Sequence, residues 1–119
     1  MAHWIFQSKP GTGLDPRRCV KRYRSRIAAG DDIAFWQTGG VGLVGLGAIA
    51  GPPELDAEAG WTAPITLLRV FPEAPVPRAA LLADPDFADS AILRMPGAAS
   101  PFPVTGTEWA AILRHTAGR

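Results

Sequence analysis

The sequence predicts a single α+β domain built around a small curved β-sheet, and three observations support this prediction. The chain has 119 residues, a length typical of one domain with one hydrophobic core. Its hydrophobic fraction of 47% is typical of a globular protein and not of a disordered one. Strand patterns fill the first two-thirds of the chain, whereas short helical patterns and proline-broken loops fill the rest.

Four segments are predicted to be strands: 3–7, 33–37, 41–50 and 61–71. The first is a short apolar run that ends before a Pro-Gly turn. In the second, Ile33 and Phe35 share one face while Ala34 and Trp36 share the other. A turn at residues 38–40 joins it to the glycine-rich third segment, so these two strands should form an antiparallel hairpin.

The helical predictions are shorter. Between residues 17 and 29 the apolar side chains Val20, Tyr23 and Ile27 recur three and four residues apart, which predicts one basic helix. Residues 78–83 predict a helical turn, and the Asp-Pro-Asp run from residue 84 predicts a helix start that extends toward residue 93. Thr105 and Glu108 have the spacing of a capping box before a terminal helix. Residues 11–16, 54–60 and 95–103 are predicted to be loops.

Positive charge is concentrated in one stretch of the chain. The net charge is +1, but residues 1–50 carry seven Lys/Arg against three Asp, whereas residues 51–119 carry five Arg against eight acids. Six of the twelve cations fall within residues 17–26. Such a stripe on a near-neutral protein predicts a confined contact with an anionic partner, and a solvated helix face is an equally good alternative.

The sequence lacks the residues that several kinds of function require. No apolar run approaches the roughly 20 residues of a membrane span, and the first ten residues lack the pattern of a signal peptide, so a cytoplasmic protein is expected. The histidines and the single Cys19 are scattered, and the serines have no triad setting, so neither a metal site nor catalysis is expected. The GVGLVG run at 40–45 is soon broken by prolines, which argues against a dinucleotide site, and no cofactor is expected.

The four tryptophans suggest a binding role. Trp36 projects from a strand on the face away from Ile33 and Phe35, beside the predicted basic helix. An indole next to several cations can stack on a nucleobase while the cations contact phosphate. Alternatively, Trp36 fills the other side of a small barrel.

The chain resembles the EVE domain family. Residues 22–39 read RYRSRIAAGDDIAFWQTG, residues 42–47 read GLVGLG, and residues 4–10 read WIFQSKP, all similar to that family's pattern. With Trp61 and the Glu108-Trp109 helix, the resemblance covers nearly the whole chain, so residues 1–119 are expected to form one domain. It implies a PUA-like fold, a small, partly closed β-barrel with short flanking helices.

The resemblance also implies a function without catalysis. The protein would bind nucleic acid and hold a modified base, chiefly a modified cytosine of DNA, flipped into an aromatic pocket, with a separate effector such as a nuclease as a further partner. The implied pocket residues are Gln7, Ser8, Lys9, Tyr23, Trp36, Thr38 and Gly39. The implied phosphate contacts are Arg18, Arg22, Arg24 and Arg26.

Two departures from the family pattern bear on the ligand. Lys9 stands where many members have an asparagine, and Arg17-Arg18-Cys19 stands where many have a tryptophan. Either another aromatic side chain supplies that wall of the pocket, or Arg18 stacks in its place, or base recognition is weakened. Three alternatives remain: an RNA-binding module that reads a modified ribonucleotide, a small-molecule-binding or hydrolytic protein with the same cavity, and an interaction domain for an acidic partner.

Overall fold

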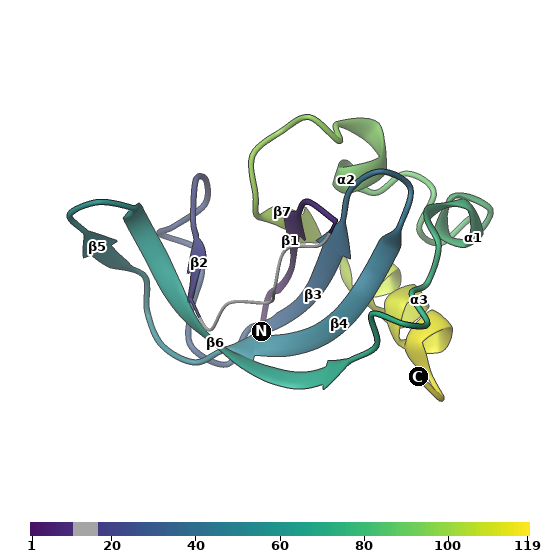
Figure 1. Cartoon of the computed structure of the whole chain (residues 1–119), viewed down its shortest axis with the longest axis horizontal. Coiled ribbons are helices and arrows are strands. Elements are labelled where there is room, and N and C mark those ends of the chain that lie inside the picture. Colours follow the sequence, from purple (N-terminus) through teal and green to yellow (C-terminus); the bar gives the residue numbers. More distant parts are fainter. Residues whose placement is uncertain (11–16) are drawn as a thin grey trace.

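The chain folds into a curved sheet with short helices on one side (Figure 1), as seen in a computed structural model that describes residues 1–10 and 17–119. The predicted loop at 11–16 lies outside the described residues. In chain order the elements are β1 (His3–Ser8), β2 (Arg17–Cys19), β3 (Asp32–Gln37), β4 (Gly42–Ile49), β5 (Glu54–Asp56), β6 (Gly60–Val70), α1 (Arg78–Leu82), α2 (Ala91–Arg94), β7 (Phe102–Val104) and α3 (Gly106–Thr116).

The strands form one mixed sheet in the order β2-β6-β4-β3-β1-β7, and β5 pairs with β6. The predicted hairpin is confirmed, because β3 and β4 pair antiparallel. β1 runs parallel to β3, with Gln7 opposite Trp36 and Ser8 opposite Gln37. The ends of these two strands therefore lie side by side at one edge of the sheet.

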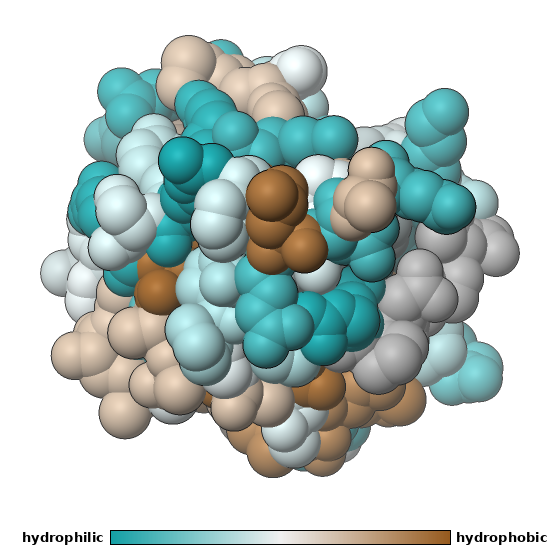
Figure 2. Space-filling model, turned by 90° about the vertical axis from the view of Figure 1, so that its left-hand side faces the viewer, coloured by the Kyte–Doolittle hydropathy of each residue, from teal (hydrophilic) through white to brown (hydrophobic). Residues whose placement is uncertain are grey.

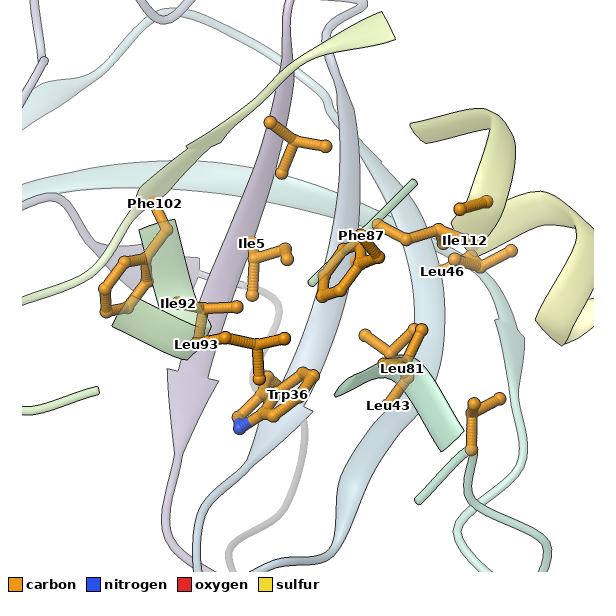
Figure 3. Close-up of a cluster of buried hydrophobic side chains, with 14 of the residues drawn as sticks. Ile5, Trp36, Leu43, Leu46, Leu81, Phe87, Ile92, Leu93, Phe102 and Ile112 are labelled. Carbon is orange, nitrogen blue, oxygen red and sulfur yellow. The ribbon is translucent and has the colours of Figure 1, made fainter. Parts of the chain in front are cut away.

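The two faces of the sheet carry separate cores. The curl brings β1 and β6 into one buried cluster, which consists of Trp4, Phe6, Val20, Ile27, Ile33, Phe35, Val44, Ile49, Ala63 and Ile65. The other face carries Ile5, Ala34, Trp36 and Leu43 and is covered by side chains of the three helices (Figure 3). The predicted alternation of residues 33–36 between two faces is thus confirmed. The result is the α+β half-barrel that the sequence predicts.

The predicted helix over residues 17–29 is wrong. Residues 17–19 pair with β6 as strand β2, and residues 20–30 form irregular turns. Tyr23 has a φ of 62°, which is incompatible with a right-handed helix. Val20 and Ile27 are nevertheless buried in the cluster that contains Trp4 and Phe6. Their spacing resembles that of a helix because successive turns, and not one helix face, bring them to this core.

Three further boundaries differ from the predictions. Residues 54–56 and 102–103 were expected in loops, but they form β5 and most of β7. The helix expected from residue 84 begins only at Ala91, because the Asp84 side chain accepts from the amide of Asp86 in a local turn and Ser90 is extended.

The C-terminal prediction is confirmed. Thr105 and Glu108 form both hydrogen bonds of a capping box at the start of α3, and α1 occupies the predicted helical turn. At 11 residues α3 is short, and no helix in the described part of the chain is long and apolar enough to cross a membrane.

Candidate functional site

A pocket of about 530 Å³ lies at the C-terminal end of β1. This volume falls within the range of about 300–1,000 Å³ that small-molecule sites occupy. The pocket is formed by the ends of β1 and β3, by β2 with the residues after it, and by the segment before β7. Its described lining consists of Phe6, Gln7, Ser8, Lys9, Arg17, Arg18, Cys19, Lys21, Thr38, Ala99 and Ser100.

Hydrogen bonds fix the wall that the segment before β7 contributes. The amide N of Gln7 donates to Ser100 Oγ at 2.8 Å, and its side-chain Nε2 donates to the carbonyl of Pro96 at 3.2 Å. The amide N of Lys21 donates to the carbonyl of Ser100 at 3.1 Å. Three segments that are distant in sequence are thus joined around one space, which gives the pocket a defined shape.

Two polar groups on the pocket residues have no hydrogen-bond partner among the described residues. These are the buried atoms Gln7 Oε1 and Ser8 Oγ. Because a carbonyl only accepts, the bond to Pro96 requires that Nε2 face it, which leaves Oε1 as the available end of the Gln7 amide. Buried polar atoms are almost always satisfied, so these two indicate where a ligand would supply partners.

Arg18 places a guanidinium group in the pocket. It is half-buried, its Nη2 donates to the carbonyl of Gln7 at 3.0 Å, and its Cζ lies 6.0 Å from the ring centroid of Phe35. These contacts hold the planar group against the end of β1. A fixed guanidinium plane can stack on a heterocycle as well as attract an anion.

The described pocket lining is strongly basic. It contains Lys9, Arg17, Arg18 and Lys21, and none of its described residues is acidic. Arg17 forms an exposed ion pair with Glu54 at 3.4 Å, a type of pair that contributes little energy. Figure 2 shows the face that carries β5 and β2, where hydrophilic residues predominate and hydrophobic ones gather mainly along the lower edge. This positive charge favours a ligand that is itself an anion or that carries anionic groups next to the part bound in the pocket.

The arginines of the turn segment lie outside the pocket lining, each over an aromatic ring. The Cζ of Arg24 is 4.3 Å from the ring centroid of Trp61, and that of Arg26 is 5.2 Å from that of Tyr23. Arg22 lies over Tyr23 and donates from Nε to the carbonyl of Ala99. Arg24 and Arg26 are exposed, whereas Arg22 is half-buried and tied to the pocket wall.

The sequence-predicted site residues divide into two groups. Gln7, Ser8, Lys9, Thr38 and Arg18 all line the pocket. The other predicted pocket residues, Tyr23, Trp36 and Gly39, do not.

The structure corrects the placement of Trp36. Its side chain is only 4% exposed and packs in the core on the helix side of the sheet, near Ile5, Leu43 and Leu93 (Figure 3). Tyr23 packs against Trp4 with ring centroids 5.6 Å apart, and Gly39 is an exposed turn residue with a φ of 77°. The alternative in which Trp36 fills the other side of the barrel describes its position, since so buried a ring has no free face for a base.

Sequence reasoning missed the pocket positions of Phe6, Arg17, Cys19, Lys21, Ala99 and Ser100. Ser100 reaches Gln7 across 93 residues of sequence, and no local pattern signals such a contact. Arg17, Cys19 and Lys21 could have been found from the basic cluster if residues 17–19 had been recognised as a strand.

The described lining of the pocket contains one nucleophile but no base beside it. Cys19 has an exposed thiol, and the described lining holds no histidine or carboxylate that could act as its base. No group of three or more potential metal-ligating His, Cys, Asp or Glu residues occurs in the described ranges. Backbone amides of Ala59 and Glu58 lower the pKa of Asp56, which lies outside the described lining.

Comparisons with known proteins define the fold class. No protein-family model matches the chain, and no curated protein matches it. Among solved structures it is similar to Rpa0253 from Rhodopseudomonas palustris, with a TM-score of 0.75 and 22% identity over 97% of this chain and 92% of that one.

Two further solved structures come from eukaryotes. A hypothetical protein from Leishmania major has a TM-score of 0.74 and 17% identity, over 96% of this chain and 93% of that one. Human THYN1, solved in complex with DNA that contains 5-methylcytosine, has a TM-score of 0.71 and 13% identity, over 100% of this chain and 99% of that one. The chain has the PUA-like fold of THYN1.

Proposed function

We propose that this protein is a nucleic-acid-binding module of the EVE type that holds one modified base, a modified cytosine of DNA, in the pocket at the end of β1. The observation that carries the proposal is the pocket itself, in which Gln7 Oε1 and Ser8 Oγ have no hydrogen-bond partner among the described residues and four cations belong to the same lining. The DNA complex of THYN1, which shares the fold, supports the same ligand class.

The polar groups of the pocket match the edge of cytosine. Cytosine carries an exocyclic amino group, and Gln7 Oε1 is a fixed acceptor for one of its hydrogens. The Ser8 hydroxyl and the Lys9 ammonium group are donors for the ring nitrogen and carbonyl oxygen of the same edge. An asparagine at position 9 would offer both a donor and an acceptor, so Lys9 makes this edge more donor-rich.

In this proposal Arg18 supplies the flat surface on which the base stacks. The described lining contains no tryptophan, and Phe6 is fully buried beneath it. Arg18 is anchored at the Gln7 carbonyl, which holds its guanidinium plane in a fixed position. A base must leave its helical stack to reach this surface, which makes unpaired or flipped nucleotides the expected ligands.

The exposed cations around the pocket contact the phosphates of the bound strand. Lys21 is an exposed residue of the pocket lining, while Arg24 and Arg26 lie on the adjacent turn segment. Such contacts add affinity for any sequence and make binding weaken with salt. We propose no reaction for this protein, and any nuclease activity would belong to a separate effector.

The test is a set of titrations with otherwise identical single-stranded oligonucleotides that carry one cytosine, 5-methylcytosine or 5-hydroxymethylcytosine, followed by fluorescence anisotropy. The three bases share the same hydrogen-bonding edge, so the difference in Kd measures burial of the 5-substituent, and a buried methyl group should tighten binding about fourfold. Equal Kd values for all three would refute the modified-base role. Tighter binding of the matched RNA would instead favour a reader of modified ribonucleotides.

A further inference from the structure

The guanidinium group of Arg24 lies over the indole ring of Trp61, beside the pocket. The Cζ of Arg24 lies 4.3 Å from the Trp61 ring centroid, the shortest of the arginine–aromatic distances among the described residues. Arg24 is exposed and Trp61 is partly exposed. In the described part of the chain, neither the guanidinium of Arg24 nor the indole nitrogen of Trp61 has a hydrogen-bond partner or an ion pair. The donors of both groups are therefore available to a ligand.

The backbone holds this pair in place. The amide of Val20 donates to the carbonyl of Trp61 at 2.8 Å, which ties the segment after β2 to β6. Tyr23 then turns the chain with its positive φ, and the amide of Arg26 closes the turn on the Tyr23 carbonyl at 2.8 Å. A bulky residue in the left-handed region costs energy, and such strain persists where the surrounding contacts fix it, often at functional sites.

The pair lies next to the pocket in the sheet and along the chain. Cys19, which lines the pocket, pairs with Thr62, the neighbour of Trp61. Lys21, also in the pocket lining, precedes Arg24 by three residues, a separation of at most about 11 Å between their α-carbons. A strand with one nucleotide in the pocket therefore has its neighbouring nucleotide within reach of Arg24 and Trp61.

We propose that Arg24 and Trp61 form a second nucleotide-binding subsite, which takes the unpaired nucleotide next to the one in the pocket. The inference rests on the proposed function and extends it from one base to two. The neighbouring base stacks on the guanidinium plane that Trp61 supports, and the free N–H groups of Arg24 donate to the adjoining phosphate. Guanidinium groups stack on planar rings and bind phosphate in a bidentate manner, which an ammonium group does not do.

With such a subsite, affinity depends on the number of nucleotides in the ligand and on a planar side chain at position 24. The ligands are the 5-methyldeoxycytidine monophosphate, a dinucleotide and a hexanucleotide that each contain this base. Trp61→Leu and Arg24→Lys should each weaken the dinucleotide and hexanucleotide about tenfold while leaving the mononucleotide unchanged. Arg24→Lys keeps the charge and removes the plane, so it separates stacking from electrostatic attraction.

Two controls guard against trivial explanations. Arg78→Gln removes one positive charge on α1, on the far side of the molecule from β2 (Figure 1), and should leave the Kd of all three ligands unchanged. Thermal unfolding of each variant shows whether it is folded, and Arg24→Lys, at an exposed position, tests the subsite even where Trp61→Leu does not fold.

The possible failures are distinguishable. If the wild-type protein binds no ligand of any length, the proposed function and the subsite are both overturned. If it binds all three ligands but Trp61→Leu and Arg24→Lys match the wild type, the subsite alone is overturned. If Arg24→Lys matches the wild type while Arg24→Gln weakens binding, Arg24 acts as a point charge and the stacking subsite is likewise overturned.

Discussion

Replacement of Gln7 by methionine should separate ligand binding from stability. Methionine has nearly the same length and volume but no amide, so Gln7→Met deletes the unpartnered Oε1 and the bond from Nε2 to Pro96 together. Gln7 is half-buried at the end of β1, where its backbone bond to Ser100 remains in the variant. The substitution therefore tests the side-chain amide while the wall of the pocket stays tied.

The effect on folding stability is the difference between two opposed contributions. Loss of the 3.2 Å bond to Pro96, which is exposed, should cost about 1 kcal/mol or less. Removal of a buried acceptor without a partner should recover about 1–3 kcal/mol. Gln7→Met is thus expected to unfold at the same urea concentration as the wild type or at a higher one.

The effect on binding is expected to have the opposite sign. A base that donates its amino hydrogen to Oε1 loses that partner, which should cost about 1–3 kcal/mol, or about 5- to 150-fold in Kd. Gln37→Met is the matched control, because Gln37 is half-buried on β3 and does not line the pocket. A Gln7→Met protein that binds modified DNA like the wild type, or that loses more than about 1 kcal/mol of stability, would refute this reasoning.

Three further predictions concern other positions. Asp31 is buried and accepts hydrogen bonds from the Trp4 indole at 3.0 Å and from the amides of Ala2 and Ala28. Asp31→Ala should therefore lower the free energy of unfolding by about 3 kcal/mol in urea titrations. An unchanged midpoint would contradict this anchoring role. Alkylation of Cys19, the single cysteine, should slow about tenfold when the oligonucleotide is present at ten times its Kd, and an unchanged rate would place the ligand elsewhere. The amide of Asp86 and then the His115 side chain lower the pKa of Asp84 in the folded state, so its stabilising contribution is present at neutral pH and is lost as the pH falls below about 4. The urea midpoint of unfolding should accordingly fall less between neutral pH and pH 3 for Asp84→Asn than for the wild type. An identical fall in both proteins would be evidence against that role.

The fold could be predicted where local patterns and tertiary structure agree. The alternation of residues 33–36 places two side chains in each core, and the capping box of Thr105 fixes the start of α3. The helix predicted over residues 17–29 is absent because periodic burial alone does not distinguish a helix from a series of turns against one core. The strand pairing of residues 17–19 with β6 depends on a partner more than 40 residues away, which no local signal reveals.

The family resemblance predicted the part of the candidate site at the ends of β1 and β3, together with Arg18. Gln7, Ser8 and Lys9 stand at the end of β1 and directly after it. Thr38 stands in the turn that follows the neighbouring strand β3. The sequence pattern predicts on which face of the sheet a side chain lies, but not whether a cavity or a helix covers that face. Trp36 is on the predicted face, yet the helices cover that face and leave no cavity there for a base.

The absence of a helix at residues 17–29 changes how the arginines act. On a helix, Arg22 and Arg26 would share one face and Arg24 would point away from them. In the observed turns Arg22 instead extends to Ala99 in the pocket wall, while Arg24 lies over Trp61 beside β6. The segment thus places guanidinium groups on two different elements that border the pocket. A bound strand that crosses the pocket would meet positive charge on both sides, and Arg24, which is exposed, has no hydrogen bond among the described residues that would compete with that strand.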